Sequence, residues 1–444
     1  MLASITLVSG YAVPSSTSSS SMELLGYYEN WNTVKWWDND IPGNCAMGCA
    51  VPQAFMEQLA PYSSLNYGFT FLVETPNPDQ VACTTASTCP LWDGGGIYIA
   101  AKSKSGATVV DASTTAADLT PGLVGVGEAC RLARMAPSSG PHRCKISLGG
   151  WSDWARLGSA AAAKQVAALA SKLVLYSFAD GVDLDFEHLT PFDAQFGGEM
   201  EAYVALVTEL RAALADAAKG WGAAVDARAA KLTTMNASVP SWQKRDYYTT
   251  NLKYLAELKA NGAPTLELSY TTRFNAFLPD PAGDPWNYLL PSSPVPNATF
   301  ATDNEGGKLW AKIGSAVDSV NVMAYDAGTD AGPLQLNFTT IASNFVAGGV
   351  PASKLYLGFE PGEQAGGGAW EGQDADLKWA ADAKEMGLAG TFIWAINPDA
   401  GSAGAAAAPK LAAALKQATG AGWPARFGPP PTYSKVDAAT GWLP

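Results

Sequence analysis

From residue 23 onward, short apolar runs of β-forming residues alternate with longer segments rich in Ala and Leu that have helical periodicity. This alternation is typical of βα units around a parallel sheet. We expect eight strands, at residues 23–28, 64–71, 143–149, 180–187, 232–238, 318–325, 355–360 and 390–396. The clearest helical segments are 159–178, 199–218, 371–387 and 404–418. Eight repeats favour an α/β fold of the closed (β/α)8 TIM-barrel type over an open doubly wound sheet.

The fifth strand is the least constrained, because residues 265–270 (TLELSY) compete with 232–238 for that place. Long connections follow the second and fifth strands, at 72–120 and 240–316. In a barrel the loops after the strands build the substrate site, so these segments are either cleft walls or decoration that faces solvent. The seventh and eighth predicted strands are separated by only about 30 residues.

The barrel is expected to span residues 22–418, with a different composition at each end. Residues 1–21 contain the apolar stretch 2–13 and a serine run, which predicts a leader or a disordered N-terminus. Residues 419–444 are rich in Gly and Pro, and we expect an extended linker or a docked end. No later apolar run is long enough to cross a bilayer.

The charge balance excludes several classes of partner. The chain has 28 Lys and Arg against 41 Asp and Glu, for a net charge of −13. We therefore expect no nucleic acid and no anionic membrane surface as partner, and we expect a monomer. The two histidines, His142 and His188, and the cysteines are not at zinc-site spacing, so we expect no metal and no other cofactor.

All six cysteines lie in the first third of the chain. The simplest of the fifteen arrangements pairs Cys45 with Cys49, Cys83 with Cys89 and Cys130 with Cys144. Disulfides imply an oxidising compartment, so we expect a secreted, extracellular protein; buried free thiols are the alternative. Three sequons for N-glycans agree with secretion, at Asn236, Asn297 and Asn337.

The fourth predicted strand carries an unusual row of acids, in the sequence DGVDLDFE. Side chains of a strand alternate between its faces, so Asp183, Asp185 and Glu187 share one face. Three carboxyl groups in a low-dielectric barrel repel one another, which pushes their pKa values apart. A carboxyl that stays protonated near neutral pH suits a general acid, and Glu187 is nearest the carboxyl-terminal mouth. The alternatives are ion-pair partners and a site for a divalent cation.

The spacing D-G-x-D-x-D-x-E closely resembles the signature of glycoside hydrolase family 18, the chitinases and their relatives. Four further motifs and one Trp lie on the expected strands. They are Gly26-Tyr27-Tyr28-Glu29-Asn30-Trp31, Asn66-Tyr67-Gly68-Phe69, Ser147-Leu148-Gly149-Gly150-Trp151, Met323-Ala324-Tyr325-Asp326 and Trp394. The sequence departs from many relatives at His188, where they have an aromatic residue.

The resemblance implies a mechanism in which no enzyme carboxylate attacks the sugar. The acetamido oxygen of the substrate is the nucleophile, and the configuration is retained. Glu187 would then protonate the leaving oxygen, and Asp185 would orient the acetamido N–H. Asp183 would share a proton with Asp185, and Tyr325 would donate a hydrogen bond to the acetamido oxygen.

The resemblance also implies a substrate-binding surface that is largely aromatic, because the flat C–H faces of a sugar stack on indole and phenyl rings. Trp394 would form the floor, with Tyr27 and Phe69 as walls and Trp31 and Trp151 in neighbouring subsites. Met323, Asp326 and the backbone at Gly150 would complete the contacts.

The resemblance implies a chitinase that hydrolyses β-1,4 linkages between N-acetylglucosamine units. Some members of the family have an α+β insertion between the seventh and eighth strands, for which this sequence has no room. The expected cleft is therefore comparatively open, which favours cleavage inside the polysaccharide. Two alternatives remain: a lectin-like protein that binds chitin without cutting it, and an endo-β-N-acetylglucosaminidase acting on N-glycans. Phosphate-loop, serine-hydrolase and zinc-protease motifs are absent from the sequence.

Overall fold

The architecture is taken from a computed structural model of the chain. The structure describes residues 22–30, 52–72, 91–92, 94–99, 108–137, 141–187, 199–238, 246–274, 276–277, 305–326, 337–363, 370–398, 401–440 and 442–443.

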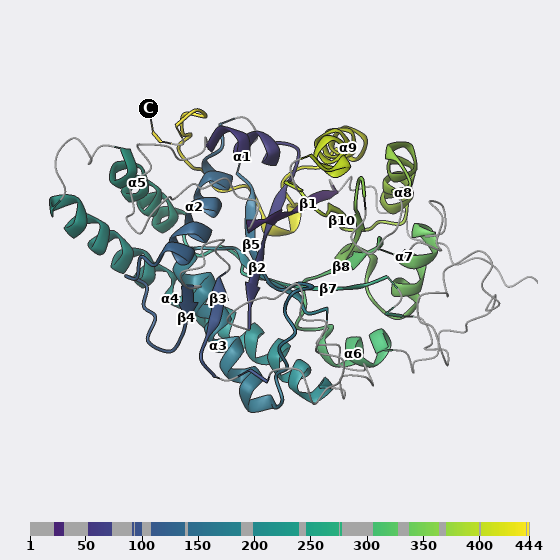
Figure 1. Ribbon diagram of the computed structural model, residues 1–444, viewed down its shortest axis with the longest axis horizontal. Helices are drawn as coiled ribbons and strands as arrows, with labels where there is room; N and C mark the ends of the chain where they lie inside the picture. Colours follow the sequence, from purple (N-terminus) through teal and green to yellow (C-terminus); the bar gives the residue numbers. More distant parts are fainter. Residues whose placement is uncertain are drawn as a thin grey trace, which may run out of the picture.

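Eight parallel strands close into a barrel at the centre of the molecule (Figure 1). They are β1 (Glu23–Glu29), β2 (Ser64–Phe71), β5 (Arg143–Gly149), β6 (Gly181–Asp185), β7 (Glu267–Arg273), β8 (Ser319–Met323), β9 (Leu355–Phe359) and β10 (Gly390–Ile393). The order is β1-β10-β9-β8-β7-β6-β5-β2, and β2 pairs again with β1. The predicted (β/α)8 TIM barrel is confirmed.

Helices surround the barrel (Figure 1). They are α1 (Pro52–Leu59), α2 (Pro121–Met135), α3 (Ala160–Ser177), α4 (Met200–Ser238), α5 (Asp246–Asn261), α6 (Glu305–Ile313), α7 (Phe338–Ala347), α8 (Gln373–Glu385) and α9 (Ala403–Thr419). Local sequence explains their ends: the Ser159 and Ser402 side chains cap α3 and α9 by accepting backbone N–H groups. The described residues between β9 and β10 form α8 and no α+β insertion.

The fifth strand is β7, and the prediction of a strand at 232–238 was wrong. Those residues are the last two turns of α4. The physical reason is a helical repeat of buried side chains that continues from Trp221 through Val225 and Arg228 to Leu232. The competing segment 265–270 supplied most of the true strand.

The long connection after β2 carries a β-hairpin, made of β3 (Ile97–Ile99) and β4 (Thr108–Val110). β3 pairs antiparallel with the end of β2, so the hairpin extends the sheet beyond the barrel wall. The Pro-rich residues 278–298 of the second long connection lie outside the described residues.

The Cys130–Cys144 disulfide joins α2 to β5, as predicted. The other four cysteines, Cys45, Cys49, Cys83 and Cys89, lie outside the described residues. Among the helices of the described segments, none has the length and apolar character that a bilayer crossing requires.

The C-terminal segment packs against the amino-terminal end of the barrel. Arg426 forms ion pairs with Glu23 and Glu267, which begin β1 and β7. The Arg143 guanidinium lies 3.4 Å from the ring centre of Phe427. The acidic row of β6 extends towards the opposite, carboxyl-terminal end of the strands.

Gly181 begins β6 and explains the glycine of the acidic motif. Its φ angle is +154°. A Cβ atom at this position would lie 2.0 Å from the carbonyl oxygen of Glu267 on β7. Only glycine lets β6 approach β7 this closely, so the acidic row depends on it.

Replacing Gly181→Ala should lower the free energy of unfolding by about 3 kcal/mol, because the new methyl group overlaps the β7 backbone. Guanidinium unfolding followed by Trp fluorescence measures this change. Gly222→Ala is the matched control, because Gly222 lies within α4 with no atom within 4 Å of the added Cβ. The control should gain up to about 1 kcal/mol. Equal stability of the two variants would contradict the close approach of the strands.

Candidate active site

The acidic row runs from the barrel interior to its mouth. Asp183 and Asp185 belong to β6, and Glu187 follows two residues after the strand ends. Asp183 is fully buried, Asp185 is nearly so, and Glu187 keeps part of its surface exposed. The side chains therefore form one line with increasing access to solvent.

Asp183 is the centre of a hydrogen-bond network that joins five strands. Its two carboxylate oxygens accept bonds from four hydroxyl groups and one amide. The donors are Tyr27 Oη (2.9 Å), Ser147 Oγ (2.9 Å), Ser269 Oγ (2.6 Å), Thr271 Oγ1 (2.8 Å) and Asn321 Nδ2 (3.0 Å). These bonds satisfy a carboxylate that has no access to water. Proton sharing with Asp185 stays a prediction.

Asp185 is buried but incompletely satisfied. Its Oδ1 oxygen has no hydrogen-bond partner within the described part of the chain. Burial raises the pKa of this carboxyl well above its ordinary value, and the charges of Glu187 and Asp183 add to the effect. An unpaired buried acceptor is costly, and a bound ligand with an N–H group would remove that cost.

Glu187 has the protonation behaviour of a general acid. Burial of the carboxyl, together with the neighbouring charge of Asp326, raises its pKa to about 8. Most Glu187 side chains therefore carry the proton at neutral pH. The pKa of the Tyr325 hydroxyl is raised well above 10, first by burial and then by Tyr27 and nearby carboxyl groups, so it stays a donor.

Aromatic rings line the mouth beside the acids. The Trp394 ring stacks on Phe69, with centres 5.5 Å apart, and lies 5.8 Å from Tyr27. Phe392 is 5.4 Å from Tyr27 and 6.1 Å from Tyr325. The structure thus brings together four of the aromatic residues predicted to bind substrate or act on it.

Two asparagines hold the backbone under this platform. Asn30 Nδ2 donates to the Phe69 carbonyl at 2.9 Å. Asn397 accepts from the Glu29 N–H at 2.8 Å and donates to the Glu29 carbonyl at 2.9 Å. The bonds join neighbouring strands beyond their last paired residues, where the backbone groups have no partner in the regular ladder.

The remaining predicted residues lie around the same mouth, with one exception. Gly150, with φ of +82°, lies against the Phe69 ring, and its N–H donates to the Asp185 carbonyl at 2.6 Å. Trp151 is 61% exposed, and Met323 packs beside the aromatic cluster. Trp31 lies outside the described residues, as does His188.

The sequence prediction missed most of the donors to Asp183. Ser147 was part of a quoted motif but received no role. Ser269 and Thr271 lie on β7, the strand that was misplaced. Asn321 could have been predicted, because side chains of a strand alternate between its two faces. Asn321, Met323 and Tyr325 therefore face the same side.

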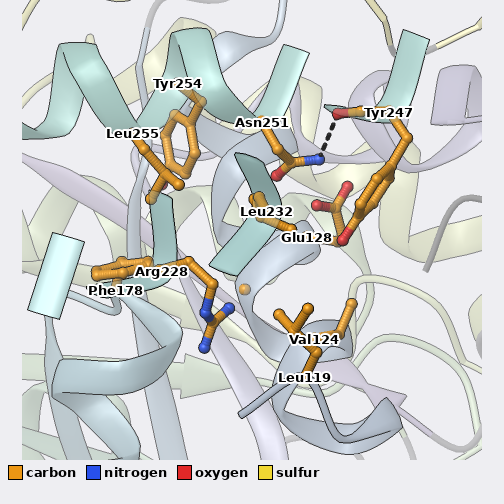
Figure 2. A pocket seen from close by; sticks show the side chains of 11 residues that line it. Leu119, Val124, Glu128, Phe178, Arg228, Leu232, Tyr247, Asn251, Tyr254 and Leu255 are labelled. Atoms are coloured by element: carbon orange, nitrogen blue, oxygen red, sulfur yellow. Dashed lines mark hydrogen bonds between the residues drawn. The ribbon is translucent and has the colours of Figure 1, made fainter. Parts of the chain in front are cut away.

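No cluster of His, Cys, Asp and Glu suited to a metal ion occurs within the described segments. A small cavity lies elsewhere, in the helix layer between α2, α4 and α5 (Figure 2). Its one arginine, Arg228, donates to the carbonyls of Ala116 and Tyr176. None of the predicted site residues lines this cavity.

No family model and no curated protein matches the chain. Solved structures do match it. A glycoside hydrolase family 18 (GH18) chitinase variant from Cycas revoluta, in complex with (GlcNAc)4, is 17% identical with a TM-score of 0.47, over 88% of this chain and 99% of that one. A GH18 chitinase from Pseudoalteromonas aurantia is 14% identical, and a GH18 N-acetylglucosaminidase from Paenibacillus barengoltzii is 13% identical. Both have a TM-score of 0.47, over 89% of this chain and 99% of theirs. No function follows from likenesses at this level.

Carboxyl-labelled glutamate provides a direct test of the electrostatics by ¹³C NMR. The Glu187 resonance, assigned by its loss in Glu187→Gln, should titrate with a midpoint near pH 8. Asp326→Asn should move the midpoint to lower pH, because it removes a like charge that disfavours ionisation of Glu187. A midpoint near 4.3, the value of an unperturbed glutamate, would contradict the buried carboxyl.

Proposed function

We propose that the protein is a family 18 glycoside hydrolase that cleaves β-1,4 linkages between N-acetylglucosamine units. The observation that carries the proposal is the change in hydrogen bonding and in pKa along the row formed by Asp183, Asp185 and Glu187. Asp183, with five donors, lies beneath an Asp185 oxygen that has no partner in the part of the chain that the structure describes, and Glu187 with a pKa of about 8 lies above them. An acceptor for an amide N–H, beside a protonated acid, suits a sugar that carries an acetamido group.

In the proposed reaction the substrate supplies its own nucleophile. Asp185 Oδ1 accepts the acetamido N–H and turns the acetamido oxygen towards the anomeric carbon. As that oxygen bonds to the carbon, the glycosidic bond breaks and Glu187 gives its proton to the leaving oxygen. Water then attacks the anomeric carbon, and the bond between that carbon and the acetamido oxygen breaks, which restores the acetamido group. The Glu187 carboxylate takes a proton from the attacking water, which restores the acid.

Tyr325 and the aromatic platform have supporting roles in this scheme. The Tyr325 hydroxyl, with its raised pKa, donates to the acetamido oxygen and holds it in line. The Trp394 ring, braced by Phe69 and Tyr27, is the floor for the apolar face of the sugar. Asp326 and the backbone at Gly150 contact the same unit.

We further propose that the protein is a secreted monomer and that it cleaves bonds in the interior of the chitin polysaccharide. The absence of an α+β insertion among the described residues between β9 and β10 leaves one side of the mouth without an added wall. The Cys130–Cys144 disulfide is consistent with folding in an oxidising compartment.

Glu187→Gln should lower kcat on soluble chitin oligomers by roughly a hundredfold to ten-thousandfold, because it removes the transferable proton and keeps the shape of the side chain. Chromatography of the released oligosaccharides measures the change. Glu209→Gln is the control, since Glu209 belongs to a surface ion pair with Lys164 and should retain activity. Calorimetric binding of the oligomer with no product from the wild-type protein would instead favour a lectin-like role.

The product pattern from a labelled hexamer of N-acetylglucosamine separates the remaining possibilities. Attack by the acetamido oxygen followed by water retains configuration, so the new reducing ends should be β-anomers. Internal cleavage should release trimers and tetramers together with dimers from the start of the reaction. Products of α configuration would contradict the mechanism, and release of glycan from a high-mannose glycoprotein in place of chitin cleavage would favour the endo-β-N-acetylglucosaminidase.

A further inference from the structure

The loop at 150–158, which follows β5, extends the apolar surface of the mouth outward. At its start, Gly150 lies against Phe69, and an added Cβ atom would be 2.6 Å from that ring. Trp151 is 61% exposed, and its ring centre is 6.0 Å from that of Trp154. The position of Trp151 relative to the Phe69 and Trp394 platform therefore depends on how this loop is held.

Asp153 makes the bonds that hold the start of the loop. Its side chain is buried, and one oxygen accepts the Leu72 N–H at 2.8 Å while the other accepts the Ala155 N–H at 3.1 Å. Its own N–H donates to the Gly150 carbonyl at 3.0 Å, which closes a turn with Trp151 inside it. Leu72 directly follows β2, the strand that carries Phe69.

These bonds have no support from an ion pair. Among the described residues, the contacts of the Asp153 carboxyl are with backbone N–H groups alone. Burial raises its pKa to about 7, and the two N–H bonds act in the opposite direction. The nearby cation in the loop, Arg156, pairs with Glu199 instead. A carboxyl buried without a cation is costly, so its bridge between two segments is its evident contribution.

The far end of the loop is held separately. Glu199, just before α4, accepts the N–H groups of Leu157 at 2.9 Å and Gly158 at 3.1 Å. The loop is thus fixed at both ends by carboxylates, and Asp153 is the one that sets its distance from β2.

We propose that Asp153 is a positioning residue for the substrate cleft, which fixes Trp151 in line with the Phe69 and Trp394 platform so that sugar units beyond the reacting one stack on it. This inference rests on the proposed function. Asp153 does not touch the substrate; it acts through Trp151.

The test compares Asp153→Asn with the wild-type protein on a long and a short substrate, the hexamer of N-acetylglucosamine and a chromogenic disaccharide. The amide nitrogen of Asn cannot accept a hydrogen bond, so one of the two backbone N–H groups loses its acceptor. The ratio of kcat/KM for the hexamer to that for the disaccharide should fall about tenfold, mainly through KM for the hexamer. Trp151→Ala should lower the same ratio.

The double variant decides whether Asp153 acts through Trp151. Its ratio should equal that of Trp151→Ala alone, because a residue that acts only through Trp151 has nothing left to position. An unchanged ratio in Asp153→Asn would overturn the inference. A double variant whose ratio falls by the product of the two single-variant factors would also overturn it. If Asp153→Asn fails to fold by circular dichroism, Asp153→Ser, whose single oxygen cannot occupy the positions of both carboxylate oxygens, takes its place.

Failure of the proposed function is visible separately, as a wild-type protein that cleaves neither substrate. The same ratio is then taken from dissociation constants for the hexamer and the dimer by calorimetry. A variant ratio equal to that of the wild-type protein, or wild-type protein that binds neither sugar, would overturn the positioning role.

Discussion

The buried carboxylate of Asp183 is the constraint on which the rest of the site depends. A charge in the middle of a barrel costs several kcal/mol unless hydrogen bonds replace its water. Here five donors do so, from β1, β5, β7 and β8. The donors are inward residues of the strands around β6, so the carboxylate depends on the register of these strands and on polar side chains in the barrel interior.

The same interaction makes the three acids chemically different although they share one strand face. Asp183 has five donors, whereas Asp185, two residues further along β6, has an oxygen without a partner among the described residues. Burial raises the pKa of both Asp185 and Glu187. The charges of Glu187 and Asp183 add to the effect at Asp185, and the charge of Asp326 adds to it at Glu187. The graded supply of hydrogen bonds thus leaves a fully bonded carboxyl at the base and, at the mouth, a carboxyl whose pKa is about 8.

The sequence was sufficient for features that depend on periodicity and failed where two periodicities compete. Seven of the eight strands and the row of acids follow from alternation within single runs. Residues 232–238 are β-prone by composition, but they continue the buried stripe of a long helix, and tertiary packing decided in favour of the helix. Because of that one misplacement, the prediction also missed Ser269 and Thr271. Their hydroxyl groups can bond Asp183 only when β7 lies beside β6.

Other parts of the site could not be predicted because their partners are far apart in the chain and join a side chain to a backbone group. Past the ends of the strands the regular ladder stops, and the backbone N–H and carbonyl groups need other partners. Asn30 reaches the Phe69 carbonyl, Asn397 reaches Glu29, and Asp153 reaches Leu72. A backbone group can be bonded by any short polar side chain that folding brings near it, so no residue pattern marks these pairs. The sequence shows which aromatic residues can form the platform. The hydrogen bonds that fix the geometry of these residues can be identified only in the folded barrel.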